Sequence, residues 1–220
     1  MNRLINLTFH GVGTATRRLE QGEDDVWVSS EQFRAMLDSA AVRQDIRISF
    51  DDGNASDVDE ALPALRDRGL SATFFVVAGR VGTSGFLDAS GIRELADAGM
   101  TIGCHGMRHQ PWRKLDDATL HNELVEARRV LEAIVDRPVT QAACPFGSYD
   151  RHVLSTLRRC AYVNVYTSDR GTARPRDWLQ ARNTVRRGDN GTLVEHILAA
   201  ERGRYHAVRH KARLALKRWR

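Results

Sequence analysis

The sequence has few cysteines and no long hydrophobic run, and both absences exclude classes of protein. Its three cysteines, Cys104, Cys144 and Cys160, form neither an even set nor a C-x-x-C pair. This argues against a disulfide framework and against a cysteine-rich zinc site. No apolar stretch approaches the roughly 20 residues that cross a bilayer. The first residues lack the basic start, apolar run and cleavage site of a signal peptide, so we expect a cytoplasmic protein.

The net charge of +5 is concentrated near the end of the sequence. Residues 201–220 hold eight Arg or Lys against one Glu, whereas the preceding residues hold 25 basic and 27 acidic ones. The body of the chain therefore has no excess of basic residues, and we do not expect a nucleic-acid partner. With 220 residues, 42% of them hydrophobic, the chain is long enough to form one domain with a substantial core.

Short apolar runs alternate with helical patterns along the chain. The runs are rich in Val, Ile, Phe and Thr and predict strands at 4–9, 46–50, 72–77, 101–104, 140–144 and 162–166. Apolar residues at helical spacing predict a helix that begins at Ser29 or Ser30 and further helices at about 56–68, 90–98, 116–135 and 149–159. This alternation, without a Gly-rich dinucleotide motif, predicts a small barrel-like α/β fold of parallel strands over residues 1–190.

Residues 191–220 are predicted to form a basic, helical C-terminal extension. Apolar side chains recur there every three or four positions, at Tyr205, Val208, Ala212, Leu216 and Trp219. A basic amphipathic helix can rest on an anionic membrane, which would make the protein peripheral to the inner membrane face. The same apolar stripe could equally pack on the barrel, and the sequence leaves both alternatives open.

Polar residues that directly follow strands mark where chemistry is expected in a parallel α/β fold. Asp51 and Asp52 end one predicted strand, His105 and His109 follow another, and a turn at 145–147 follows a third. Adjacent carboxylates repel each other unless a cation is near, and two His with one carboxylate can hold a divalent metal. Taken singly, each motif has a plainer interpretation: a helix cap, a chance spacing and an ordinary turn.

Together these motifs resemble those of the polysaccharide deacetylase family, the NodB-homology carbohydrate esterases of family 4. The matching segments are Ser-Phe-Asp-Asp-Gly (49–53), Ala-Thr-Phe-Phe-Val (72–76), Ile-Gly-Cys-His-Gly-Met-Arg-His (102–109) and Cys-Pro-Phe-Gly (144–147). Their order and spacing match too, and the similarity spans roughly residues 3–187. The resemblance implies a distorted (β/α) barrel of about seven parallel strands, which agrees with the pattern of predicted elements.

The resemblance also implies roles for individual residues. Asp51 would be the catalytic base, and the ligands of a divalent metal, with zinc as the expected ion, would be Asp52, His105 and His109. A substrate groove with an oxyanion donor at the Phe146 amide would be formed by Pro145, Phe146 and Gly147. Such a metal polarises an acetamide carbonyl and makes hydroxide available at neutral pH.

The implied function is removal of the N-acetyl group from an N-acetylated sugar, in the metabolism of glycans or lipid-linked glycans. One alternative is a metal-dependent C–N hydrolase that acts on a non-sugar amide. Another is a degenerate deacetylase domain that binds glycan or is tethered to a membrane. The intact residues Asp51, Asp52, His105 and His109 argue against a degenerate domain.

Two features of the family have no evident counterpart in this sequence. The third motif of many members carries an Arg that orients the base, whereas residues 143–145 here are Ala-Cys-Pro. Many members also have a Leu-x-His motif whose His protonates the leaving amine, and only His196 is a weak match. His10, in Phe9-His10-Gly11, resembles a His found in a subset of the family. The general acid therefore stays unassigned at this stage.

Overall fold

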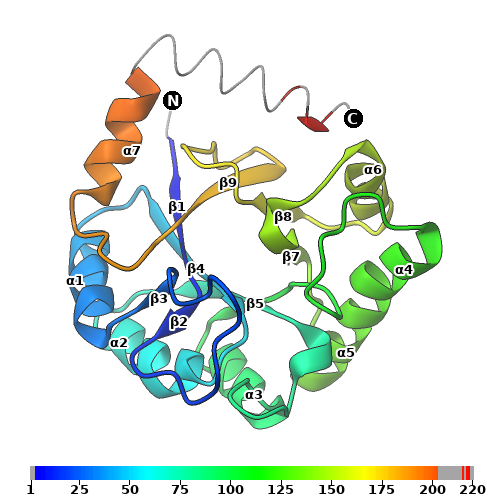
Figure 1. Ribbon diagram of the computed structural model, residues 1–220, viewed down its shortest axis with the longest axis horizontal. Coiled ribbons are helices and arrows are strands. Elements are labelled where there is room, and N and C mark those ends of the chain that lie inside the picture. Colours follow the sequence, from blue (N-terminus) through cyan, green and yellow to red (C-terminus); the bar gives the residue numbers. More distant parts are fainter. Residues whose placement is uncertain (1–2, 203–214, 216, 219–220) are drawn as a thin grey trace.

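The computed structural model describes residues 3–202, 215, 217 and 218. Within this part of the chain, seven parallel strands form a closed barrel in the order β1, β4, β5, β6, β7, β8 and β9, and β9 pairs with β1 (Figure 1). Parallel neighbours need crossover connections, and the helices that surround the barrel in Figure 1 supply most of them. The predicted barrel of about seven parallel strands is confirmed.

The strands of the barrel are short. They are β1 (Ile5–Phe9), β4 (Ile46–Asp52), β5 (Ala72–Val76), β6 (Thr101–Cys104), β7 (Gln141–Ala143), β8 (Asn164–Thr167) and β9 (Leu179–Thr184). A separate two-stranded sheet pairs β2 (Gly11–Val12) with β3 (Trp27–Val28). Six barrel strands coincide with the predicted apolar runs. The sequence pattern did not indicate β9.

Several helices begin at the polar caps that the sequence offers. The helices are α1 (Ser30–Ala41), α2 (Leu62–Arg66), α3 (Ala89–Asp97), α4 (Asp117–His121), α5 (Ala127–Val135), α6 (Arg151–Arg159) and α7 (Leu193–Arg202). Two π-helical turns, Asp57–Ala61 and Asn122–Glu126, precede α2 and α5, and 3₁₀ turns lie at Ala78–Arg80 and Pro145–Gly147. Side chains that accept a backbone N–H at helix starts belong to Ser29, Asp88, Asp116 and Asp150.

The barrel separates apolar from polar side chains by the two-residue period of its strands. Phe9, Phe50 and Phe74 are paired across β1, β4 and β5, and their rings stack with centroids 5.6 and 4.6 Å apart. Phe33 of α1 packs edge-on against this stack, so the apolar face points towards the helices. The alternate residues Ser49 and Asp51 point the other way, into a polar interior.

The C-terminal helix α7 lies beside α1 at the outside of the barrel (Figure 1). Its Val194 and Ile197 are buried and belong to the hydrophobic core. No helix in the described ranges is long and apolar enough to span a membrane. The residues of the predicted apolar stripe, Tyr205, Val208, Ala212, Leu216 and Trp219, lie outside the described residues. The proposed boundary near residue 190 and the membrane contact therefore stay predictions.

Candidate active site and metal centre

All of the predicted site residues except His196 lie at the C-terminal ends of the barrel strands, where parallel α/β folds usually place their active sites. Asp51 and Asp52 end β4, His105 follows β6, and the turn Pro145–Gly147 follows β7. The loop after β6 also carries His109. The structure thus brings together three segments that are far apart in the sequence.

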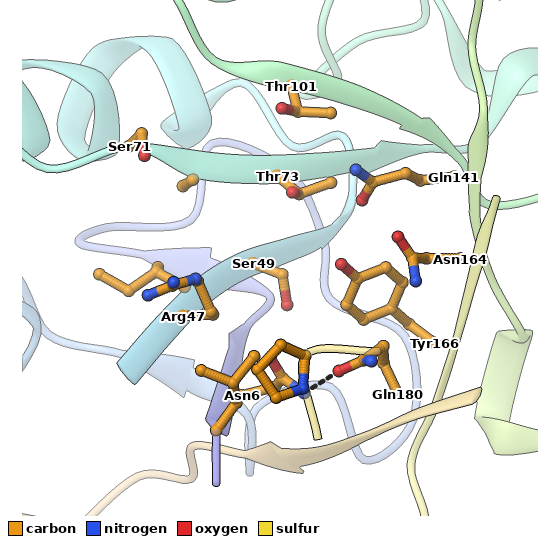
Figure 2. A pocket seen from close by; sticks show the side chains of 14 residues that line it. Asn6, Arg47, Ser49, Ser71, Thr73, Thr101, Gln141, Asn164, Tyr166 and Gln180 are labelled. Atoms are coloured by element: carbon orange, nitrogen blue, oxygen red, sulfur yellow. Dashed lines mark hydrogen bonds between the residues drawn. The ribbon is translucent and has the colours of Figure 1, made fainter. Parts of the chain in front are cut away.

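A polar cavity lies at the opposite end of the barrel. Its volume is about 370 Å³, and its lining comes from the first halves of the strands. Figure 2 shows Asn6, Ser49, Gln141 and Tyr166 among its walls and a hydrogen bond from Asn6 to Gln180. None of the predicted site residues lines this cavity. It is separate from the strand ends where the carboxylates and histidines meet.

Asp52, His105 and His109 form a compact group of potential metal ligands. One ligand atom from each lies within 4.8 Å of the other two. The Nε2 atoms of His105 and His109 are 3.6 and 3.0 Å from Asp52 Oδ1. Ligands about 2.0–2.2 Å from one zinc ion are separated by distances of this order. The three predicted ligands therefore converge on a common point.

Local backbone strain supports this convergence. Asp52 has φ 78° and His109 has φ 50°, in the left-handed region that is uncommon for residues other than glycine. Gly53 continues the turn after Asp52 with φ 74°. The two-residue alternation of side chains along β4 ends at this turn, and the Asp52 side chain is directed towards the histidines. Such strained positions cluster at functional sites because the surrounding structure must hold them there.

His105 is oriented by a hydrogen bond on the side away from the aspartates. Its Nδ1 lies 2.9 Å from the carbonyl oxygen of Ala143, to which a protonated Nδ1 donates. The lone pair on Nε2 is then free to face Asp52. Burial lowers the pKa of His105 to about 4, so the ring is neutral at neutral pH. A neutral imidazole held in one tautomer by a carbonyl is typical of a metal ligand.

The charges of the other two residues also fit a cation. Burial raises the pKa of Asp52, but the adjacent His109 outweighs it and brings that pKa well below its usual range. Burial lowers the pKa of His109, but Asp52 more than compensates and raises it. Asp52 Oδ1 is buried without a well-aligned hydrogen-bond donor among the described residues. An ionised carboxylate beside two imidazole nitrogens fits a divalent cation, which would replace the proton on His109.

Asp51 has a different partner. Arg182, on β9, donates two hydrogen bonds to it, from Nη1 to Oδ1 at 2.6 Å and from Nη2 to Oδ2 at 2.7 Å. Burial raises the pKa of Asp51, but the Arg182 guanidinium outweighs it and lowers that pKa, so the carboxyl group stays ionised. The neighbouring aspartates therefore have separate surroundings, with Arg182 on Asp51 and the histidines on Asp52.

The remaining predicted site residues differ in their positions. The ring of Phe146, which is 65% exposed, lies 4.6 Å from that of His109. His10 follows β1, its Nδ1 is buried without a partner in the described part of the chain, and its charge lowers the pKa of both Asp51 and Asp52. His196 is exposed on α7 beside α1, so the structure does not bring it to the cluster.

The part of the chain that holds the site also matches a known protein family. The polysaccharide deacetylase family model matches residues 39–165, more than half of the chain. The chain belongs to the polysaccharide deacetylase family. The model covers the aspartate pair, both cluster histidines and the turn at 145–147. It ends before β9 and therefore does not cover Arg182.

Individual members of the polysaccharide deacetylase family show the extent of the similarity. The chain is 28% identical over 159 residues to a chitooligosaccharide deacetylase of a Bradyrhizobium species, with 71% of this chain and 66% of that one aligned. It is 29% identical over 156 residues to a peptidoglycan-N-acetylglucosamine deacetylase of Bacillus cereus, with 68% and 70% aligned. The aligned region spans between 50% and 70% of the length of three curated relatives.

Solved structures of the family confirm the fold. The deacetylase PplD of Streptococcus pyogenes, solved in complex with acetate, superposes with a TM-score of 0.77. The aligned region covers 89% of this chain and 97% of that one, at 16% sequence identity. The two proteins therefore share the barrel over almost the whole length of PplD, although few of their aligned residues are identical.

Sequence reasoning missed two residues that support the site of this family member. Arg182 was missed because it lies in a polar segment, Leu-Gln-Ala-Arg-Asn-Thr, that has no strand signal. Glu123 was missed because it lies within a helical pattern. It is fully buried and accepts hydrogen bonds from the backbone N–H groups of Met107 and Arg108. A polar residue on the apolar face of the predicted helix was the only signal that the sequence offered for it.

Proposed function

We propose that this protein is a metal-dependent hydrolase that removes the N-acetyl group from an N-acetylated sugar. The observation that supports this most is the cluster of Asp52, His105 and His109 beside the Asp51–Arg182 pair, at the strand ends of a polysaccharide deacetylase barrel. The names of the chitooligosaccharide and peptidoglycan deacetylases it resembles suggest the substrate class.

The chemistry requires a polarised carbonyl and an activated water molecule. A divalent cation held by Asp52, His105 and His109, with zinc the expected ion, would supply both by acting as a Lewis acid and lowering the pKa of water. Asp51 accepts the proton that the attacking water loses. The two hydrogen bonds from Arg182 fix the orientation of the Asp51 carboxylate for this transfer.

The sugar amine needs a proton as it leaves. His10 is the proposed donor, because it follows β1 at the same end of the barrel and its Nδ1 is buried without a partner among the described residues. The exposed ring of Phe146, packed against His109, offers an apolar face to a sugar. The proposed proton acceptor Asp51, the proton donor His10 and the substrate contact Phe146 would then surround one cluster.

The test combines metal analysis with acetate release. Purified protein should contain close to one divalent ion per chain and should release acetate from N-acetylglucosamine oligomers. His105→Ala should lose both the ion and the activity, because it removes one of three ligands. Wild-type protein that carries metal but releases acetate only from a non-sugar amide would overturn the proposal.

Substitution of the two neighbouring aspartates tests the division of their roles. Asp51→Asn should keep the metal and lose about two to four powers of ten in rate, the usual range for a lost general base. Asp52→Asn should lose the metal as well. Equal metal loss in the two variants would contradict separate roles.

A further inference from the structure

Beside the proposed active site, three groups surround the ammonium of Lys217. Its Nζ donates hydrogen bonds to the carbonyl oxygen of Gly147 at 2.7 Å and to Asp169 Oδ1 at 2.6 Å. Nζ also lies 4.1 Å from the centroid of the Tyr149 ring. A carboxylate, a carbonyl and an aromatic face together match the donors and the charge of a primary ammonium.

Asp169 is a nearly buried carboxylate with one oxygen left for a cation. Its side chain is only 5% exposed, and Oδ2 accepts hydrogen bonds from the Tyr149 hydroxyl at 2.6 Å and the Thr167 hydroxyl at 2.9 Å. Both hydroxyl donors bind the same oxygen, which leaves Oδ1 for the ammonium. A buried carboxylate is costly without a cationic partner, so this position favours occupation by a cation.

The ammonium site adjoins the proposed catalytic centre. Gly147 belongs to the same turn as Phe146, whose ring contacts His109. A Cβ atom at Gly147 would come within 2.9 Å of Ser168 Cβ, so the turn packs directly on the residue before Asp169. The Lys217 side chain is 30% exposed, whereas Asp169 is 5% exposed and Tyr149 is buried, so a ligand can reach this site only when Lys217 moves away.

We propose that Asp169, Gly147 and Tyr149 form a subsite for the ammonium group of an amino sugar, and that Lys217 occupies this subsite when no such sugar is bound. The sugar identity rests on the proposed function, because that reaction converts N-acetylated sugars into sugars with a primary amine. The Lys217 ammonium is tethered to the chain and already binds Asp169 and Gly147, so an amine on the substrate competes with a tethered side chain.

Binding of glucosamine to the full-length protein tests the subsite, with glucose as the control that lacks the amine. Lys217→Met removes the competing ammonium and keeps the length of the side chain. It should bind glucosamine at least tenfold more tightly than wild type, because a tethered group acts at a millimolar or higher local concentration. Glucose affinity should not change. The matched variant Lys114→Met, which removes an exposed lysine elsewhere, should behave like wild type.

A second substitution shows whether Asp169 carries the effect. Asp169→Asn combined with Lys217→Met keeps acceptor and donor groups next to Tyr149 and Thr167 but removes the negative charge. It should abolish the gain in glucosamine affinity. An unchanged glucosamine affinity in Lys217→Met, or an equal gain for glucose, would overturn the proposal and leave Lys217 as a tie between the chain end and the barrel.

Wild-type protein offers a readout that needs no variant. The sequence has only three lysines, so the Nζ resonance of Lys217 can be assigned by ¹⁵N NMR. Glucosamine should shift it, and glucose should not; the absence of a shift at saturating glucosamine would contradict the subsite. Because these assays measure amine binding and not acetate release, failure of the subsite and failure of the deacetylase proposal give different results.

Discussion

Arg182 shows how a single buried charge can organise a candidate active site. Its side chain is almost fully buried, and its guanidinium lies 5.1 and 5.8 Å from the ring centroids of Phe75 and Tyr166. Nη1 also contacts Ser49 Oγ at 3.3 Å. Packing against both rings limits the movement of the guanidinium, and its planar fork matches the carboxylate of Asp51. The orienting Arg that the third motif lacks is thus matched by one from a different strand.

Arg182→Lys should separate positioning from charge. Lysine keeps a positive charge but cannot form both hydrogen bonds in one plane, so we expect kcat for acetate release to fall roughly tenfold to a hundredfold. KM and metal content should stay close to wild type, because Arg182 contacts neither the proposed ligands nor the groove. Steady-state kinetics and metal analysis on the same samples check this.

Arg47→Lys is the matched control for Arg182→Lys, since Arg47 is exposed on β4 and makes no contact with Asp51 among the described interactions. It should leave kcat unchanged. A large rise in KM or loss of metal in Arg182→Lys, with kcat unaffected, would contradict a positioning role.

The loop after β6 depends on a helix for its shape. Glu123, in the π-helical turn Asn122–Glu126, accepts hydrogen bonds from the N–H groups of Met107 and Arg108 at 2.9 and 3.2 Å. Its carboxylate also accepts from Gln110 Nε2 at 2.9 Å and Trp112 Nε1 at 3.3 Å. These four donors belong to residues 107–112, a segment that includes the proposed ligand His109. The helix thereby holds the loop that carries His109 of the proposed metal site.

Glu123→Gln should weaken the metal site without touching a ligand. The amide NH₂ group would face N–H donors, which leaves buried polar groups unpaired and costs about 1–3 kcal/mol of unfolding free energy. We expect zinc affinity to fall roughly tenfold to a hundredfold, as for other residues that orient ligands. Isothermal titration with zinc and thermal unfolding of metal-free protein provide the measurements.

Glu126→Gln, three residues along in the same turn, provides the comparison for Glu123→Gln, because Glu126 is partly exposed and pairs with Arg129 at the surface. It should change zinc affinity little. If both variants bind zinc as wild type does, Glu123 does not support the site.

The described part of the chain is a barrel whose strands have an apolar outer face, covered by helices, and a polar interior. The helix α7 is added at the outside of this barrel (Figure 1). The stacked rings of Phe9, Phe50 and Phe74 lie on the outer face, while Asp51 and Arg182 pair within the barrel. α7 adds to the outer face through Val194 and Ile197, which are 2% and 9% exposed. Residues on both sides of the predicted boundary at 190 therefore share one hydrophobic core.

Two truncations test how the end of the chain contributes to this core. A chain ending at residue 190 lacks α7 and therefore the buried side chains of Val194 and Ile197. Each contributes about 1.5–3 kcal/mol, so the unfolding free energy should fall by roughly 3–6 kcal/mol. A chain ending at residue 202 keeps Val194 and Ile197 and should lose much less. Urea unfolding compares them with the full chain. Equal stability of the two truncations would show that α7 does not contribute.

Local patterns in the sequence determined most of the elements and the candidate ligands. Apolar runs give the six strands from β1 to β8 in the barrel, and Ser29 and the glycines at 69 and 99 mark helix boundaries, because these signals act over a few residues. Asp52, His105 and His109 could be grouped from the sequence because Asp52 ends one strand, both histidines follow another, and parallel strands end at one edge. Their roles as ligands came from the resemblance to the family.

Only the tertiary structure decided which partners these residues have. β9 has no apolar pattern because Gln180 and Arg182 are buried in a polar interior, where a strand needs matching hydrogen bonds more than hydrophobicity. Asp51 and Arg182 are separated by 131 residues, and Asp169 and Lys217 by 48. Such contacts depend on closure of the barrel, which brings β9 back to β1, and on where the chain end lies. No pattern of a few neighbouring residues specifies a contact between residues so far apart in the sequence.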